Sequence, residues 1–274
     1  MAMTGAGGDL DPAVEAYASG VAGRLLGVLG SDLVGVYLHG SAVLGGWHAE
    51  VSDIDLLGVV TGPLPEPAKR TVAERLTGPA LPCPAAHGLE LSLITAATAR
   101  TPARLPPFEL HVAFAPGTRR HREGFPVNLP RTKVVDGSGQ AGDPDLLLYV
   151  AVCRRSGRAV LGPPPAMVFA EPPRPWLLEA TAHELRWAAG RATFAYRVLT
   201  ACRAWRFLED DVLASKLAAG AWARTRLAAA TPDLADLVGL VDLALAAQRG
   251  EIPMPVDPAL LSAADQFMKR VLER

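Results

Sequence analysis

The sequence predicts an α/β (α+β) N-terminal domain with a mixed sheet, followed by an all-α helical bundle domain. Three apolar runs early in the chain have the length of buried strands: Leu33–Leu38, Leu56–Val60 and Leu89–Ile94. After Pro175 the composition changes to Ala, Leu and Arg, with apolar residues at helical spacing. Because 274 residues exceed one domain of ordinary size, we expect two domains, residues 1–160 and 161–274.

The first domain is expected to open with a helix. Asp11-Pro12 is a typical helix start, and apolar residues recur at helical spacing from Val14 to Val28. The other elements that we expect are a helix at Ala68–Leu76, strands at Leu89–Ile94 and Phe108–Phe114, and a helix at Leu146–Arg155. Proline-rich segments between residues 160 and 175 predict a stiff connection to the second domain.

The second domain is expected to consist of about five helices. The periodic segments are Trp176–Ala189, Ala192–Leu208, Asp211–Leu227, Leu234–Gln248 and Pro258–Leu272. We expect Trp187, Trp205 and Trp222 to fill the core of the bundle, because a helical tryptophan most often packs there. Arg197 and Arg206 are assigned to its surface.

Composition excludes several classes of function. The 27 basic and 28 acidic side chains leave a net charge of −1, which gives no support for a nucleic-acid partner. Cys83, Cys153 and Cys202 are widely spaced and form no CxxC motif, so a reduced compartment is favoured over a zinc site. The N-terminus lacks a secretory signal pattern and no apolar run reaches about 18 residues, so we expect a cytoplasmic protein with no membrane partner.

The most informative motif is Asp53-Ile54-Asp55, at the start of an apolar run. Side chains in a strand alternate between its faces, so both aspartates are expected on one face and Ile54 on the other. Two neighbouring carboxylates repel each other unless a cation joins them, and Mg2+ prefers carboxylate oxygens and substrate phosphates. Alone, the motif is equally consistent with a solvated strand end.

A Gly40-Ser41 turn precedes this motif, directly after another apolar run. Glycine lets the backbone approach a phosphate closely, and serine supplies hydroxyl and N–H donors. We expect Gly40 and Ser41, together with Ser52, to bind phosphate oxygens. The two motifs together predict a site for Mg2+ and a nucleotide.

These residues carry a resemblance to known enzymes. Gly40-Ser41 followed by Asp53-Ile54-Asp55 resembles the signature of the DNA-polymerase-β-like nucleotidyltransferase superfamily. The wider pattern, from His39-Gly40-Ser41-Ala42-Val43 to Ser52-Asp53-Ile54-Asp55-Leu56-Leu57, is similar to the aminoglycoside adenylyltransferases that act on streptomycin and spectinomycin. The resemblance implies an N-terminal nucleotidyltransferase domain that binds ATP as co-substrate with Mg2+.

Glu90 is an acidic side chain inside an apolar run, where it shares a face with Ser92. If this strand lies beside Asp55, Glu90 could hold a metal ion with the two aspartates or act as general base toward an acceptor hydroxyl. Otherwise it is a strand-end glutamate that faces water. In the adenylyltransferases the corresponding strand carries the catalytic base, and the resemblance implies that role for Glu90.

Two cations in the second domain, Arg203 and Lys216, lie in apolar helical segments. A charge there is awkward unless it has a partner or extends to the surface. The resemblance implies that both bind the triphosphate, so that the site is completed by both domains. The implied reaction transfers AMP from Mg-ATP to a hydroxyl of a small-molecule acceptor and releases pyrophosphate.

The residues expected to bind the acceptor match the family less well than the residues expected to bind the nucleotide. The family has a tryptophan that packs on the antibiotic, and its position falls near Ala115 of this chain. The family's aspartate that binds the amines of the antibiotic falls near Thr193. The Trp and Asp associated with streptomycin fall near Glu184 and Ala189, so Glu184, with Glu109, is the carboxylate left for a cationic acceptor.

The most direct reading is an enzyme of antibiotic resistance or self-protection that modifies an aminoglycoside or aminocyclitol. Another natural product, a protein or an RNA end stays open as acceptor. A nucleotide-binding regulatory module without catalysis is a further alternative, although such a module has no physical need for three carboxylates.

Overall fold

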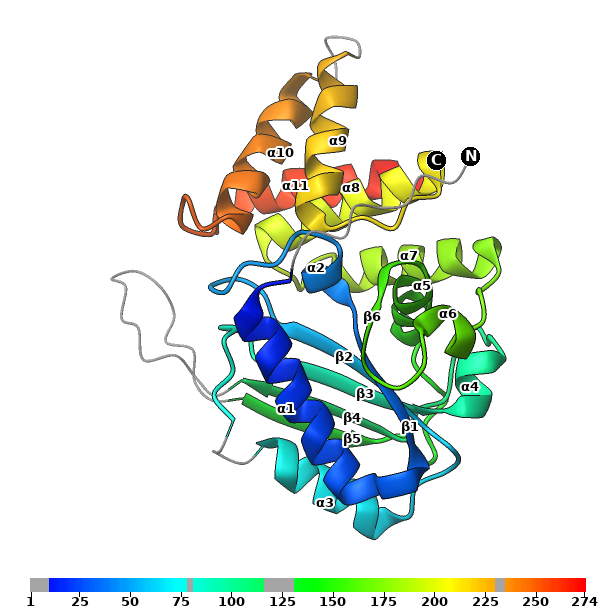
Figure 1. The fold of residues 1–274 in the computed structure, drawn as a ribbon. Helices are drawn as coiled ribbons and strands as arrows, with labels where there is room; N and C mark the ends of the chain where they lie inside the picture. The colour runs from blue at the N-terminus through cyan, green and yellow to red at the C-terminus, as the bar shows by residue number, and fades with distance from the viewer. Residues whose placement is uncertain (1–9, 78–80, 116–130, 230–234) are drawn as a thin grey trace. The chain divides into compact units, whose positions relative to one another are not determined.

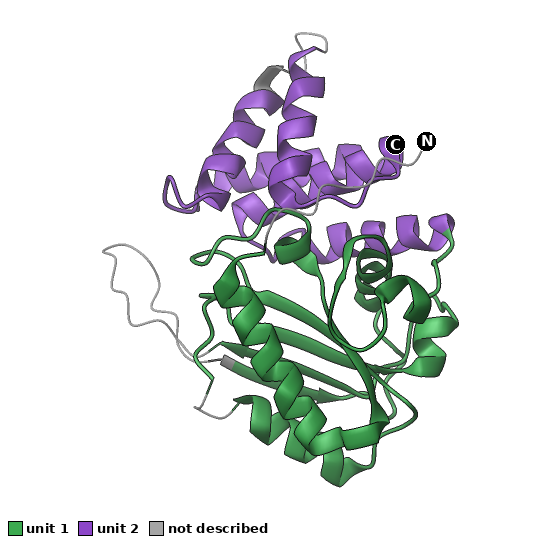
Figure 2. Ribbon diagram, viewed as in Figure 1, with its two compact units in different colours: residues 1–173 green, residues 174–274 purple. Residues whose placement is uncertain are grey.

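The computed structural model describes residues 10–77, 81–115, 131–229 and 235–274 (Figure 1). The chain divides into two compact units, Met1–Pro173 and Arg174–Arg274 (Figure 2). This division lies beyond the expected boundary at residues 160 and 161. The reason is that Arg158–Leu161 forms strand β6, which pairs with strand β1 (Leu33–Leu38) of the first unit.

Unit 1 is built on a mixed sheet, as expected. The described strands form one six-stranded sheet in the order β5-β4-β3-β2-β1-β6. The remaining strands are β2 (Ile54–Val60), β3 (Leu89–Thr95), β4 (Leu110–Ala115) and β5 (Arg131–Asp136). Strands β2 and β3 run parallel, and the other neighbouring pairs are antiparallel.

Helices cover both faces of this sheet. Those of unit 1 are α1 (Pro12–Leu29), α2 (Gly40–Val43), α3 (Glu66–Thr77), α4 (Ala96–Arg100), α5 (Asp145–Ser156) and α6 (Pro165–Val168). Helix α1 begins as predicted, because the Asp11 carboxylate accepts a hydrogen bond from Ala13 N at 2.8 Å and Pro12 occupies the first turn. Figure 1 shows α1 lying across one face of the sheet.

The alternation along the central strands divides the core into two layers. Ile54 and Leu56 of β2 pack with α1 and α3 on one face. Leu57 and Val59 of the same strand pack with α4, α5 and α6 on the other face. Asp55 has the same parity as Leu57 and Val59, so it lies on the face that α5 covers.

A buried lysine fastens α3 to the edge of the sheet. Lys69 Nζ donates to Asp136 Oδ1 at 2.7 Å and to Ser138 Oγ at 2.8 Å, and Glu109 Oε2 lies 3.6 Å away. The hydrogen bond from Lys69 holds the pKa of Asp136 far below its ordinary value. Glu109 also accepts from Leu64 N at 2.8 Å. Glu109 is therefore held by structural contacts, and the expectation that it faces a cationic acceptor is not supported.

Unit 2 is the expected helical bundle. Its described helices are α7 (Arg174–Ala188), α8 (Phe194–Asp210), α9 (Lys216–Ala228), α10 (Ala235–Gln248) and α11 (Pro258–Leu272). Thr193, Ser215 and Asp257 cap the starts of α8, α9 and α11 through their side-chain oxygens. Helix α8 packs against the four others, so its apolar residues form the centre of the core. Among the described helices, none is long and apolar enough to cross a membrane.

Two expectations about side chains in this bundle are wrong. Trp205 is buried and meets Trp222 edge to face at 5.0 Å, but Trp187 is 50% exposed. Arg197, expected at the surface, is only 6% exposed. Its guanidinium donates to Asp265 Oδ2 at 2.9 Å and to the carbonyl of Ala192 at 2.8 Å, so it joins α8 to α11.

The burial of Arg197 predicts a stability effect. Arg197→Ala removes the ion pair and leaves the carbonyl of Ala192 without its side-chain donor. We expect the free energy of unfolding to fall by about 2–3 kcal/mol, less than for a fully buried pair because Asp265 stays partly in water. Urea denaturation followed by helical circular dichroism measures this change.

The matched control is Arg224→Ala, since the Arg224–Asp242 pair at 2.6 Å lies in the same unit with both side chains about half exposed. Removal of an exposed pair is expected to cost less than about 1 kcal/mol. Equal losses in the two variants would contradict the structural role of Arg197.

Candidate active site

Three predicted carboxylates converge on one face of the sheet in unit 1. The parallel register of β2 and β3 places Asp55 directly beside Glu90. Asp53 precedes Asp55 by two residues and keeps the same face. Ligand oxygens of Asp53, Asp55 and Glu90 all lie within 4.8 Å of one another. The structure therefore brings together the three residues that the sequence predicted as a group.

The pKa of Glu90 is raised within this carboxylate cluster. Burial raises the pKa of Glu90, and the nearby charge of Asp53 raises it further. A hydrogen bond from Tyr149 and the positive charge of Lys133 act in the opposite direction. A divalent cation between the three groups would offset this repulsion. Hard carboxylate oxygens at this spacing fit Mg2+, which is commonly held by carboxylates and substrate phosphates.

Gly40 is required by its position against Asp55. Its backbone has φ +63°, a left-handed conformation that glycine adopts without strain. A side-chain carbon at Gly40 would overlap the carboxylate of Asp55. The preceding residue, His39, donates its backbone N–H to Asp55 O at 3.0 Å. The Gly-Ser turn is therefore built directly against one of the predicted metal ligands.

The two serines of the motifs have different environments. Ser41 Oγ is buried and has no hydrogen-bond partner among the described residues. A buried polar group is costly unless it is hydrogen bonded, so this hydroxyl is a candidate donor to a polar ligand. Ser52 is nearly buried, and its Oγ accepts from His48 N at 3.0 Å. Ser52 thus closes the turn that leads into Asp53, a contact that the sequence did not reveal.

Tyr149 on α5 is a residue of this site that sequence reasoning missed. Its hydroxyl donates to Glu90 Oε1 at 3.1 Å. Its ring lies against the imidazole of His39, with the ring centroids 4.8 Å apart. Burial lowers the pKa of His39 to about 3, so this imidazole is neutral at pH 7. The helical pattern of α5 was a correct prediction, but nothing in that pattern indicates which strand a tyrosine will reach.

Polar side chains extend from Glu90 along β3 to the neighbouring antiparallel strand β4. Ser92 pairs in register with His111 of β4, and Ser92 Oγ lies 3.1 Å from His111 Nδ1. Burial lowers the pKa of His111 and the charge of Lys133 lowers it further, which favours a neutral ring. The side of the sheet that carries Glu90 therefore offers hydrogen-bonding groups beyond the three carboxylates.

In unit 2, the two predicted cations belong to one polar cluster. Arg203 NH1 lies 3.6 Å from Glu184 Oε1, which also accepts from Tyr196 OH at 3.0 Å. Lys216 Nζ lies 4.0 Å from the centroid of the Tyr196 ring. The structure gathers Arg203 and Lys216 around Tyr196. It also places Glu184, expected to face a cationic acceptor, beside Arg203.

Lys216 occupies an electrostatically unfavourable position. It is the first residue of α9, directly after the capping residue Ser215. The positive end of the helix dipole disfavours a cation there, whereas it favours a bound anion. A phosphate group near Lys216 would benefit from both the lysine and the helix end.

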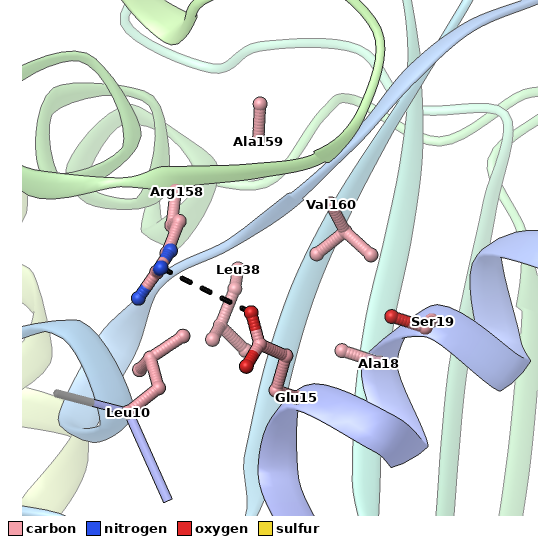
Figure 3. Close-up of a pocket in the computed structure, with 8 residues that line it drawn as sticks. All are labelled: Leu10, Glu15, Ala18, Ser19, Leu38, Arg158, Ala159 and Val160. Carbon is pink, nitrogen blue, oxygen red and sulfur yellow. Dashed lines mark ion pairs between the residues drawn. The ribbon is translucent and has the colours of Figure 1, made fainter. Parts of the chain in front are cut away.

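A small pocket of about 80 Å3 lies at another place in unit 1 (Figure 3). It is lined by Leu10, Glu15, Ala18, Ser19, Leu38, Arg158, Ala159 and Val160. Arg158 and Glu15 face each other across it at 3.9 Å. Its lining does not include the three carboxylates, so it is not the candidate active site.

Comparisons with known proteins show what this chain is similar to. Residues 168–269 match the family model of the aminoglycoside adenylyltransferase C-terminal domain. The chain is 28% identical over 229 residues to the spectinomycin 9-adenylyltransferases of Staphylococcus aureus strains Mu50 and N315, which covers 82% of this chain and 81% of each relative.

The fold is also known from a solved structure. The chain matches the crystal structure of spectinomycin adenyltransferase AAD(9) from Enterococcus faecialis with ATP and spectinomycin, with a TM-score of 0.68 and 16% sequence identity. The match covers 92% of this chain and 96% of that chain. An N-terminal nucleotidyltransferase fold and a helical C-terminal domain are thus shared with that protein. The chain is thus similar to aminoglycoside adenylyltransferases in its C-terminal family model, in its sequence and in its fold.

Proposed function

We propose that this protein transfers AMP from Mg-ATP to a hydroxyl of an aminocyclitol or aminoglycoside antibiotic and releases pyrophosphate. The observation that carries the proposal is the convergence of Asp53, Asp55 and Glu90 beside the Gly40-Ser41 turn. The names of the relatives support spectinomycin as the first acceptor to test. Because ATP is the co-substrate, the proposed reaction takes place in the cytoplasm and serves resistance or self-protection.

Asp53 and Asp55 would hold Mg2+ against the triphosphate. Bound there, Mg2+ supplies charge neutralisation for the phosphate oxygens during nucleotidyl transfer. Asp55 lies in β2 and Asp53 directly precedes that strand, while the register places Glu90 beside Asp55 on β3. Such transfer depends mainly on positioning and on charge stabilisation, which a rigid pair of adjacent strands provides.

Glu90 is proposed as the general base. Burial and the charge of Asp53 raise its pKa, and a carboxylate with increased proton affinity is a better acceptor for a hydroxyl proton. As Glu90 takes this proton, the acceptor oxygen attacks the α-phosphorus and the bond to the pyrophosphate oxygen breaks. The pyrophosphate leaves with the electron pair of that bond.

Two sets of residues are proposed to bind phosphate groups: the motif residues of unit 1 and the cations of unit 2. The buried Ser41 hydroxyl supplies a donor that lacks a protein partner among the described residues, and Gly40 keeps the turn close to Asp55. Ser52 acts by holding the turn before Asp53. Arg203 and Lys216 supply positive charge to the triphosphate, in keeping with the position of Lys216 at a helix start.

The proposed function is tested by acceptor-dependent release of pyrophosphate. With ATP, Mg2+ and spectinomycin, the purified protein should release pyrophosphate and form an AMP adduct that mass spectrometry detects. A panel with streptomycin, other aminocyclitols and other nucleoside triphosphates defines the acceptor and base preference. Glu90→Gln should lower the rate at least about 100-fold, the range expected for losing a general base, while circular dichroism stays unchanged.

Glu74→Gln is the matched control, because Glu74 is an exposed carboxylate on α3. It should retain the wild-type rate. Absence of pyrophosphate release with every acceptor would overturn the enzymatic proposal. Full activity in folded Glu90→Gln would overturn the assignment of the base.

The proposed phosphate contacts predict a nucleotide-specific defect in unit 2. Lys216→Ala and Arg203→Ala should each raise KM for ATP about 10-fold or more, since one hydrogen bond to a charged group contributes about 1.5–3 kcal/mol. Steady-state kinetics at varied ATP measures this change. Lys269→Ala, which removes an exposed lysine of α11, is the control and should leave KM unchanged. Wild-type KM for ATP in both cluster variants would contradict their role.

A further inference from the structure

We propose that Tyr149 is a positioning residue that holds the Glu90 carboxylate in its reactive orientation, an inference that rests on the proposed adenylyl transfer. The direct observation is the hydrogen bond from Tyr149 OH to Glu90 Oε1 at 3.1 Å. One carboxylate oxygen is thereby fixed, and the other remains available to the reaction. No sequence motif assigns Tyr149 to the site.

Packing of α5 fixes the tyrosine in place. Leu146, Val150 and Cys153 of this helix are buried in the core layer that contains Leu57 and Val59 of β2. Tyr149 is partly buried and packs against the same layer. A helix anchored this closely allows little movement of the hydroxyl relative to the sheet, which is what a positioning group requires.

The Tyr149 ring has a second contact, with the Gly-Ser turn. Its ring lies 4.8 Å from the His39 ring, centroid to centroid. His39 is 3% exposed, and its backbone N–H donates to Asp55 O at 3.0 Å. Tyr149 therefore touches the strand of the base through its hydroxyl and the segment before Gly40 through its ring. These contacts link the base to the turn beside the aspartates.

The hydroxyl is the donor in this contact, because an ionised carboxylate can only accept a hydrogen bond. Tyr149 is therefore a hydrogen-bond donor and not a competing base. A donor to an ionised carboxylate makes a stronger hydrogen bond than a donor to a neutral group, so its removal should be measurable.

Tyr149→Phe separates the hydroxyl from the ring. Phenylalanine keeps the packing against His39 and removes only the donor to Glu90. We expect kcat for adenylyl transfer to fall about 10- to 100-fold, the range for one hydrogen bond to a charged group. KM for ATP and for the acceptor should change less than about 2-fold, because the phosphate-binding groups are untouched. Calorimetric binding of Mg-ATP should also stay at the wild-type level.

A double-mutant cycle tests whether Tyr149 acts through Glu90. In the Glu90→Gln background, Tyr149→Phe should lower the residual rate by less than about 2-fold, since the base that it positions is gone. A merely structural tyrosine would lower the rate by the same factor in both backgrounds. That result, or a parallel loss of Mg-ATP binding, would overturn the proposal.

Tyr37→Phe provides a matched control. Tyr37 is a fully buried tyrosine of β1 whose hydroxyl has no hydrogen-bond partner among the described residues. Its kcat should equal that of the wild type. If Tyr149→Phe matches Tyr37→Phe while the wild type is active, only the positioning role fails. If the wild type transfers AMP to no acceptor, the proposed function fails and the positioning role falls with it.

Discussion

The pairing of parallel strands β2 and β3 is the constraint on which the candidate site depends. Their register sets Asp55 beside Glu90, and the period of two keeps Asp53 on the same face. A slip of one residue in either strand would turn its acidic side chains to the opposite, apolar face. The leucines and valines on both faces of these strands forbid such a slip, because their burial in two core layers specifies the register. Hydrophobic packing thus maintains three like charges in proximity.

The groups around the three carboxylates accommodate their close spacing. Gly40 leaves room for the Asp55 carboxylate, and Ser52 fixes the turn before Asp53. Tyr149 donates to Glu90 without neutralising it. The remaining repulsion between the carboxylates favours a bound cation. Unit 2 shows the complementary pattern, since its cations gather around a tyrosine and one glutamate, where an anionic ligand would be stabilised.

Local patterns predicted much of this protein, and tertiary contacts account for what they missed. Strand alternation and the Gly-Ser turn were enough to group Asp53, Asp55 and Glu90, and helical periodicity predicted the bundle. The short edge strands β5 (Arg131–Asp136) and β6 (Arg158–Leu161) were missed because arginine and lysine interrupt their apolar pattern. Tyr149 was missed because its partner lies on a distant strand. Arg197 was assigned to the surface because its pairing with Asp265 depends on how two helices pack, which no local pattern encodes.

The proposed role of the carboxylate cluster is to bind a divalent cation together with a nucleotide. Binding of Mn2+, in place of Mg2+, by electron paramagnetic resonance in the presence of a non-hydrolysable ATP analogue tests it most directly. We expect a bound Mn2+ signal in the wild type and an affinity at least about 10-fold weaker in Asp55→Asn, because a metal ligand has lost its charge. Equal Mn2+ affinity in the wild type and in folded Asp55→Asn would show that Asp55 holds no cation.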